Sequence, residues 1–436
     1  MSGDHTVPVG YGARWRQLNR AAWLYLIHAA LITGSLAITS LLYNVAILSL
    51  GYDRRFLGLL SSAGVAAAVL FSLPLWWLAA RIGFRRALLA SALLQAASAF
   101  TFALWPAAPL LLAAAALTGV AAVLFQVSAP PLMMEYTDDA TRDHLFSANA
   151  AVNIGVAGLG SWLAGRLPAL FGGWFGLGEE SALAYRYAFA AAGAGLLLAI
   201  IPLLAMRETP HAQNPQPTLA PDERAASLST RLPASLRVLA ANWRPLAQLL
   251  APPLLISVGA ALLIPYLNLF FKDRFMVGDA TLGNIFALLG LGTGGAVLAA
   301  PLLSARFGTI RTVVLVQALS IPFLLLLGWT PLLGLAITAA LMRAALFNMS
   351  APLYDAFALA QTPPPARPAV IGCVNAAYSA GYLVGPLISG VVQEQYGFAP
   401  LFIATACCYT LAALLIYIWF VRATTTPTLA RNVDSS

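Results

Sequence analysis

The chain has 436 residues, of which 60% are hydrophobic and only 9% are charged. A soluble globular protein carries about 25% charged residues, so this composition excludes a soluble enzyme, and its apolar content equally excludes a disordered chain. The formal net charge is +8, but the basic residues stand in short clusters between apolar runs. Such clusters indicate membrane topology. We expect a lipid bilayer as partner and no nucleic acid.

Twelve apolar runs predict twelve membrane-spanning helices, because a hydrocarbon core of about 30 Å needs roughly 20 helical residues. Short alternating segments of the β-barrel type are absent from the sequence. The predicted fold class is therefore an all-α integral membrane protein. The runs cover residues 21–50, 56–80, 87–105, 109–134, 145–167, 182–206, 245–271, 281–305, 312–329, 331–359, 369–392 and 399–421.

The basic residues also predict the orientation. With the N-terminus inside, 17 of the 24 basic residues fall on the cytoplasmic side, six on the opposite side and one, Arg343, within a span. Loops rich in Lys and Arg stay in the cytoplasm, so both termini are expected there, in a multi-pass protein of the cell membrane.

The sequence divides into two halves that resemble each other. A polar, proline-rich linker at 207–244, with a short surface helix expected near 227–241, separates predicted domains 1–206 and 245–436. Arg81 and Gly83 recur as Arg306 and Gly308, at an offset of 225 in the numbering. Two Ser-Ala-Pro segments and two Asn-Ala-Ala segments recur at offsets of 222 and 226. Six spans per repeat make the two bundles parallel, related by an axis along the membrane normal, with a cavity between them.

With these repeats, the chain resembles the major facilitator superfamily. The family's loop motif, Gly-x-x-x-Asp-Arg-x-Gly-Arg-Arg, is matched at Arg81, Gly83, Arg85 and Arg86, but it departs at two places, with Trp76 for the first glycine and Ala80 for the aspartate. The resemblance implies a monomeric secondary transporter that works by alternating access on an ion gradient. It also implies that spans 1, 4, 7 and 10 line the cavity.

Arg343 in span 10 is the foremost candidate for substrate binding. A lone guanidinium in the membrane is costly and is expected to face a cavity or a partner, so it indicates an anionic or amphipathic small organic solute. A structural arginine satisfied by neighbouring carbonyls is the alternative. The other polar candidates for the cavity wall are Tyr43, Asn44, Gln126, Asn268, Asn348 and Tyr354.

A second set of residues is predicted to act as a cytoplasmic gate. Glu135 and Asp355 follow the paired Ser-Ala-Pro segments and are expected to pair with the loop arginines of their own half. The full set is Arg81, Gly83, Arg85, Glu135, Arg306, Gly308, Arg311 and Asp355. No carboxylate is predicted at mid-membrane, which disfavours an exporter of cations.

The sequence shows no nucleophile motif, phosphate-binding loop or cluster of metal ligands, so we expect no enzyme, catalytic residue, metal or cofactor. Two alternatives to a solute transporter stay open on this scaffold: a lipid flippase, and a membrane sensor or scaffold that transports nothing.

Overall fold

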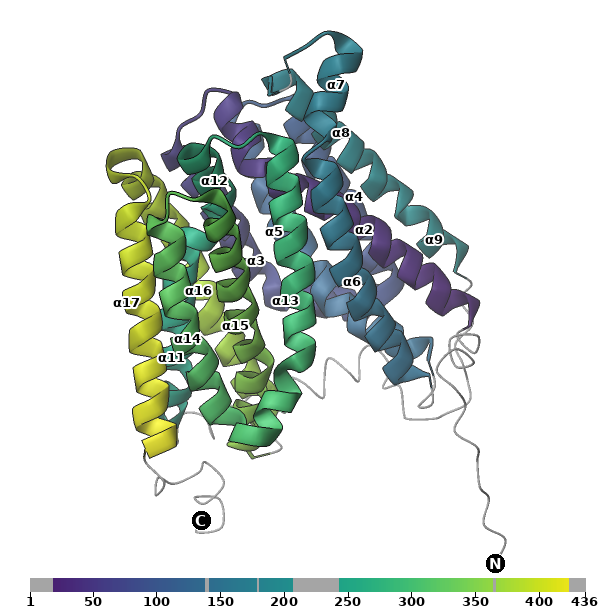
Figure 1. Ribbon diagram of the computed structural model, residues 1–436. Helices are drawn as coiled ribbons and strands as arrows, with labels where there is room; N and C mark the ends of the chain where they lie inside the picture. The colour runs from purple at the N-terminus through teal and green to yellow at the C-terminus, as the bar shows by residue number, and fades with distance from the viewer. Residues whose placement is uncertain (1–18, 138–140, 179, 207–242, 364–365, 423–436) are drawn as a thin grey trace, which may run out of the picture.

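The computed structural model describes residues 19–137, 141–178, 180–206, 243–363 and 366–422 (Figure 1). In this part of the chain every regular element is helical, and twelve helices are long and apolar enough to cross a membrane. The prediction of an all-α protein with twelve spans is therefore confirmed. The linker, including the surface helix expected near 227–241, lies outside the described residues.

The first half contains six spans, two of which consist of two helices. The elements are α2 (Arg20–Ser49), α3 (Arg54–Ile82), α4 (Phe84–Leu104), α5 (Ala108–Glu135), α6 and α7 (Arg142–Ala164 and Leu167–Phe175), and α8 and α9 (Ala182–Leu198 and Ile200–Ala205).

The second half also contains six spans. The elements are α11, η1 and α12 (Trp243–Leu263, Ile264–Tyr266 and Leu267–Phe275), α13 (Asp279–Phe307), α14 (Thr309–Trp329), α15 (Leu333–Ala360), α16 (Arg367–Tyr396), and α17 and η3 (Ala399–Ile416 and Tyr417–Arg422).

Three predicted spans end four or more residues later in the structure than in the sequence-based prediction; the eleventh does so without a break, at Tyr396 instead of residue 392. The fifth continues through α7 to Phe175, although it was expected to end at residue 167, and the seventh continues through η1 and α12 to Phe275 instead of ending at residue 271. In both, the helix is interrupted near its end, at Gly165 and at Pro265, and then resumes. Proline lacks the N–H that continues a helix, which explains the second break.

The internal repeat reappears in the helix bounds. The bounds of α3, α4 and α5 in the first half recur at an offset of 225 as those of α13, α14 and α15. Gly83 and Gly308 also share one backbone conformation, with φ of 90° and 84°. This left-handed region favours glycine, so the short turns that separate these helices require glycine in both halves.

The packing follows the same repeat. In the first half, α2 packs against α6 and α8, and α5 packs against α3 and α4; in the second half, α11 packs against α16 and α17, and α15 packs against α13 and α14. The halves meet where α3 packs on α16 and α6 on α13. Since α3 corresponds to α13 and α6 to α16, the two contacts are related by the same pseudo-twofold axis.

The two ends of the helical bundles differ. We call the end that carries Ala205 and Trp243 the linker face and the opposite end the far face. In Figure 1 the linker face points downward, and α2, α6 and α9 diverge there from α13 and α15. The halves are therefore closest at the far face.

Candidate functional site

Two asparagines join the halves near the far face. Asn44 of α2 donates from Nδ2 to the carbonyl oxygen of Pro265 at 2.6 Å and to Oδ1 of Asn268 at 2.7 Å. Asn268 donates from Nδ2 to the carbonyl oxygen of Leu41 at 2.8 Å. Each amide thus bonds the backbone carbonyl three positions before the other asparagine. We call this reciprocal pair the asparagine clasp.

The clasp follows from the repeat. Asn268 corresponds to Asn44, and Pro265 to Leu41, at one shared offset of 224, so equivalent residues contact each other across the pseudo-twofold axis. Because the α-helix is interrupted at Pro265, the carbonyl of this residue lies outside the regular helical bonding and is free to accept. Asn44 and Asn268 are 5% and 3% exposed, and buried amides of this kind need such partners.

Charged residues surround the clasp on the far face. Lys272 forms ion pairs with Glu180 at 2.8 Å and with the buried carboxylate of Asp279 at 2.6 Å. Tyr185 of the first half donates its hydroxyl to Asp279 at 2.7 Å. Lys272 and Tyr185 thereby tie the two halves together around one carboxylate.

A second ion pair lies beside this group. Arg54, at the start of α3, pairs with Asp273 at 2.7 Å, and its guanidinium also reaches Gln393 of α16 at 3.4 Å. Arg166 donates to Asn284 of α13 at 3.1 Å. Between described residues, a further bond that crosses from one half to the other joins the backbone N–H of Arg54 to Glu394 at 3.3 Å, also on the far face.

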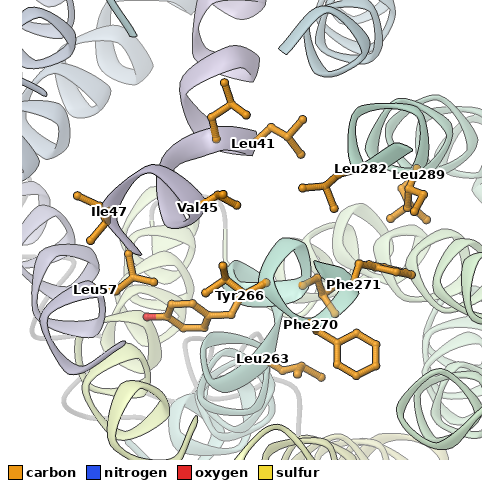
Figure 2. Packing of buried hydrophobic residues seen from close by; sticks show 14 of the residues in the cluster. Leu41, Val45, Ile47, Leu57, Leu263, Tyr266, Phe270, Phe271, Leu282 and Leu289 are labelled. Carbon is orange, nitrogen blue, oxygen red and sulfur yellow. The ribbon is translucent and has the colours of Figure 1, made fainter. Parts of the chain in front are cut away.

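Apolar side chains from both halves close the same region. Figure 2 shows Leu41 and Val45 of α2 beside Tyr266 of η1 and Leu282 of α13. These four side chains are at most 8% exposed. The far face is therefore sealed by polar bonds together with a packed apolar layer.

Arg343 lies in the interior of the second half. It is the eleventh of the 28 residues of α15 and is 5% exposed. It forms no ion pair with any described residue, its Nε is enclosed without a hydrogen-bond partner, and the hydroxyl of Tyr409 lies close to the guanidinium. Three tyrosines lie within electrostatic reach of the guanidinium: Tyr378 and Tyr382 of α16, and Tyr409 of α17.

The other predicted substrate residues are dispersed. Tyr43 packs edge-on against Phe102 inside the first half, and Tyr354 donates to the carbonyl oxygen of Leu249 at 2.8 Å, which ties α15 to α11. Gln126 and Asn348 are exposed on α5 and α15, and Asn348 bonds only its own helix, at Ala344. Of the seven candidates, the structure brings together only Asn44 and Asn268.

The predicted gate residues take several positions on the linker face. Arg81 stacks on the ring of Trp77 at 3.9 Å, and Arg85 donates to the carbonyl oxygens of Leu203 at 2.7 Å and Leu204 at 3.1 Å. Gly83 and Gly308 form the turns described above. Among described residues, Arg306, Arg311 and Asp355 form no ion pair with one another, and all three are exposed; Glu135 is exposed as well.

The sequence-based candidates did not include Lys272, Asp279, Tyr185 or the three tyrosines near Arg343. Lys272 and Asp279 stand seven residues apart on either side of a turn, a charge pattern that was visible in the sequence. The tyrosines lie on helices that the family resemblance does not assign to the cavity. Among described residues, no group of three His, Cys, Asp or Glu side chains could hold a metal ion.

Comparisons with known proteins identify this arrangement of helices. The family model described as Major Facilitator Superfamily matches residues 24–258 and again 254–435. No curated protein matches the chain. Similar solved structures include a bacterial homologue of the human lysosomal transporter Spinster, in an inward-facing and unoccupied conformation, with a TM-score of 0.69 and 15% identity over 95% of this chain and 96% of the other.

Two further structures of sugar and nucleoside carriers are similar. The xylose transporter XylE from E. coli, in an inward open conformation, has a TM-score of 0.67 and 16% identity over 95% of this chain and 98% of its own. The nucleoside transporter NupG has a TM-score of 0.65 and 15% identity, over 92% of this chain and 100% of its own. At these identities the likeness shows the shared fold.

Proposed function

Because the chain belongs to the major facilitator superfamily, we propose that it is a secondary transporter that moves a small organic solute across the cell membrane by alternating access. An ion gradient drives the movement. The linker face is the cytoplasmic face, so both termini are cytoplasmic, and the protein acts as a monomer.

The observation that carries this proposal is the unequal closure of the two faces. The asparagine clasp and the ion pairs of Lys272 and Arg54 bind the halves together at the far face. No equivalent bond between described residues joins the halves at the linker face. A structure sealed at one end by breakable polar contacts is one of the two end states that alternating access requires, and proteins of the same fold were solved in inward-facing conformations.

The charge inside the membrane indicates the kind of solute. Arg343 is a buried cation without a carboxylate partner among the described residues, and a charge in this position favours a ligand of opposite sign. We therefore expect an anionic or amphipathic organic solute, with Arg343 in contact with it and with Gln126 and Asn348 on the cavity wall.

The experiment locks the far face and asks whether solute movement stops. Cysteines replace Arg54 and Asp273, whose side chains meet across the halves, in a chain whose three native cysteines, Cys373, Cys407 and Cys408, are replaced by alanine. The protein is reconstituted into liposomes that contain a defined mixture of anionic, zwitterionic, neutral and cationic solutes. Release of each solute is followed by mass spectrometry with and without a short, reducible thiol-specific cross-linker, across an imposed ion gradient.

We expect the cross-linker to stop release and a reductant to restore it. The matched control places the two cysteines at Leu104 and Arg186, which meet at the far face but both belong to the first half, so a cross-link there leaves the halves free to move. If no solute is released by the unlocked protein, the transporter proposal fails. Movement of labelled phospholipid between leaflets, blocked in the same way, would indicate a flippase instead.

A further inference from the structure

The buried guanidinium of Arg343 has no carboxylate partner among the described residues, and the side chains near it indicate the kind of ligand that would bind there. Tyr378, Tyr382 and Tyr409 lie within its electrostatic reach, and Phe347 stacks on Tyr409. Tyr409 is 1% exposed, and among the described residues its hydroxyl lies close to the guanidinium of Arg343 without a hydrogen bond of regular geometry. Arg343 of α15 and Tyr409 of α17 therefore lie together in an aromatic setting with no carboxylate beside them among the described residues, and a buried guanidinium in such a setting costs free energy unless a ligand compensates its charge.

The aromatic rings are ordered by mutual packing. Tyr409 stacks on Phe347 with 4.4 Å between ring centroids, and Tyr378 stacks on Tyr382 with 5.7 Å between centroids. These contacts restrict the motion of the rings near the guanidinium. The polar groups are therefore positioned before a ligand arrives, which lowers the entropy that binding must overcome.

The tyrosines of α16 face the interior of the molecule. On this helix Gly381 and Gly385 pack on α11, whereas Pro386 and Gly390 pack on α3 of the other half. With about 100° between successive helical residues, the two tyrosines lie between these two packed faces. Tyr378 is 39% exposed. A ligand that reaches Arg343 from the junction of the two halves therefore passes the ring of Tyr378.

The repeat shows that the site exists in one half only. The position equivalent to Arg343 is Thr118 at the offset of 225 set by the helix bounds and Ala121 at the offset of 222 set by the neighbouring Ser-Ala-Pro segments, and neither residue is charged. Tyr378 and Tyr382 correspond, at the offset of 226, to Val152 and Val156. The cation and its tyrosines are thus additions to the second half that the common helical scaffold does not need.

We propose, resting on the transporter function above, that Arg343 and Tyr409 bind the carboxylate of an organic monocarboxylate whose apolar body lies against the rings of Tyr378 and Tyr382. Among the described residues, Arg343 is the one arginine or lysine that is buried, so the site neutralises one negative charge. A dianion would leave a net charge in a medium of low dielectric constant, where uncompensated charge is expensive. The site therefore selects monocarboxylates over dicarboxylates, phosphate dianions and neutral solutes.

Binding of three probes to the purified full-length protein in detergent tests this proposal. The probes are benzoate, the dianion phthalate and the neutral benzyl alcohol, measured by isothermal titration calorimetry. We expect benzoate to bind and the other two to bind at least about tenfold more weakly. Arg343→Gln is expected to weaken benzoate binding by about tenfold or more, and Tyr409→Phe, which keeps the ring, by several fold.

Matched controls are Arg274→Gln, an exposed arginine of α12, and Tyr417→Phe, an exposed tyrosine of η3; both should bind benzoate as the wild type does. Equal binding of benzoate by wild type and Arg343→Gln, or equal binding of phthalate and benzoate by the wild type, would overturn the proposal. If Arg343→Gln does not fold, Tyr409→Phe decides. The locking experiment uses a solute mixture, so transport of other solutes without benzoate binding would reject the substrate class alone and leave the transporter function standing.

Discussion

Among single residues, the asparagine clasp illustrates what a duplicated sequence can build on its symmetry axis. Asn44 and Asn268 are equivalent residues, and the side-chain amide of each donates a hydrogen bond to a backbone carbonyl three positions before the other. Amide–carbonyl bonds are strong enough to hold two helices together, yet their net value is small because water can replace them. Such bonds suit the alternating access proposed above, in which this contact would form and break in every cycle.

Removing one side of the clasp should destabilise the protein. For Asn44→Ala we expect the free energy of unfolding to fall by about 1–2 kcal/mol, because a buried amide loses its partners. The double variant Asn44→Ala/Asn268→Ala should lose less than the sum of the two single variants, since the bond between the two amides is lost in both of them. Thermal unfolding in detergent measures this. Asn348→Ala, whose bond lies within its own helix, is the control, and a fully additive double variant would contradict the clasp.

Two arginines stabilise helix ends in a reciprocal manner. Arg85, at the start of α4, donates to Leu203 and Leu204 at the end of α9. Arg186, near the start of α8, donates to Ala103 and Leu104 at the end of α4. The last carbonyls of a helix lack partners within it and favour positive charge. An arginine of α4 thus caps the end of α9, and an arginine of α8 caps the end of α4.

Arg85→Lys should therefore not be a conservative change. An ammonium group cannot reproduce the forked donor geometry of the guanidinium, and we expect a loss of about 1 kcal/mol in the free energy of unfolding. Arg86→Lys at the adjacent, exposed position should be neutral. Thermal unfolding of both variants decides; equal stability of the two would show that the carbonyl bonds of Arg85 contribute nothing measurable.

Among the helices, glycine sets how closely the halves approach. Where α6 meets α13, a Cβ atom on Gly283 would lie 2.7 Å from the carbonyl oxygen of Ser161 and 3.0 Å from the Cα of Gly165. These atoms belong to the backbone and cannot turn aside. Close approach of helices through small residues is the usual basis of packing in membranes, and here it lies at the sealed end of the interface.

Gly283→Ala should thus force α13 away from α6 and disfavour the closed far face. A single cysteine in place of Leu267, buried in the seal, reports this by its rate of labelling with a membrane-impermeant maleimide from the far side. We expect faster labelling in Gly283→Ala. Gly290→Ala on the same helix, where nothing lies within 4 Å of the added carbon, should label as slowly as the parent; equal rates in the two variants would refute a role for this contact.

Over the whole molecule, the repeat places two similar bundles around one axis, but the two bundles carry different charged residues at equivalent positions. Arg54 and Asp279 begin equivalent helices with opposite charge. Arg54 reaches Asp273, and Asp279 receives Lys272 and Tyr185. The far face is therefore closed by complementary charges, whereas among described residues only the second half carries a buried arginine.

The orientation of the molecule is testable independently of its substrate. The distribution of basic residues along the sequence predicts a cytoplasmic linker face and C-terminus. Alkaline phosphatase, active only outside the cytoplasm of a bacterial host, should be inactive when fused after Ser436 and active when fused into the far-face turn at Gly176. The reverse pattern would place the linker face outside and would invert the direction of the closed state.

The number of spans, the fold class and the internal repeat could all be predicted from the sequence. Those properties depend on the length of apolar runs and on residues such as Gly83 and Gly308, whose local conformation recurs wherever the same short turn recurs. The sequence also identifies Arg343 as a charge inside a predicted span, because a charged residue within an apolar run can be recognised without any knowledge of packing. The extents of the fifth and seventh spans were missed, since a helix that breaks and resumes resembles a helix that ends.

Which polar residues meet could be learned only from the tertiary structure. Asn44 and Asn268 were both candidates for the cavity wall, but their contact with each other depends on the relative position of two helices from different halves of the chain. The same holds for Asp279 with Tyr185 and for Arg343 with its tyrosines. Local sequence patterns record periodicity and apolar length; contacts between distant segments arise from how whole helices pack, and this is where the seal and the proposed binding site are formed.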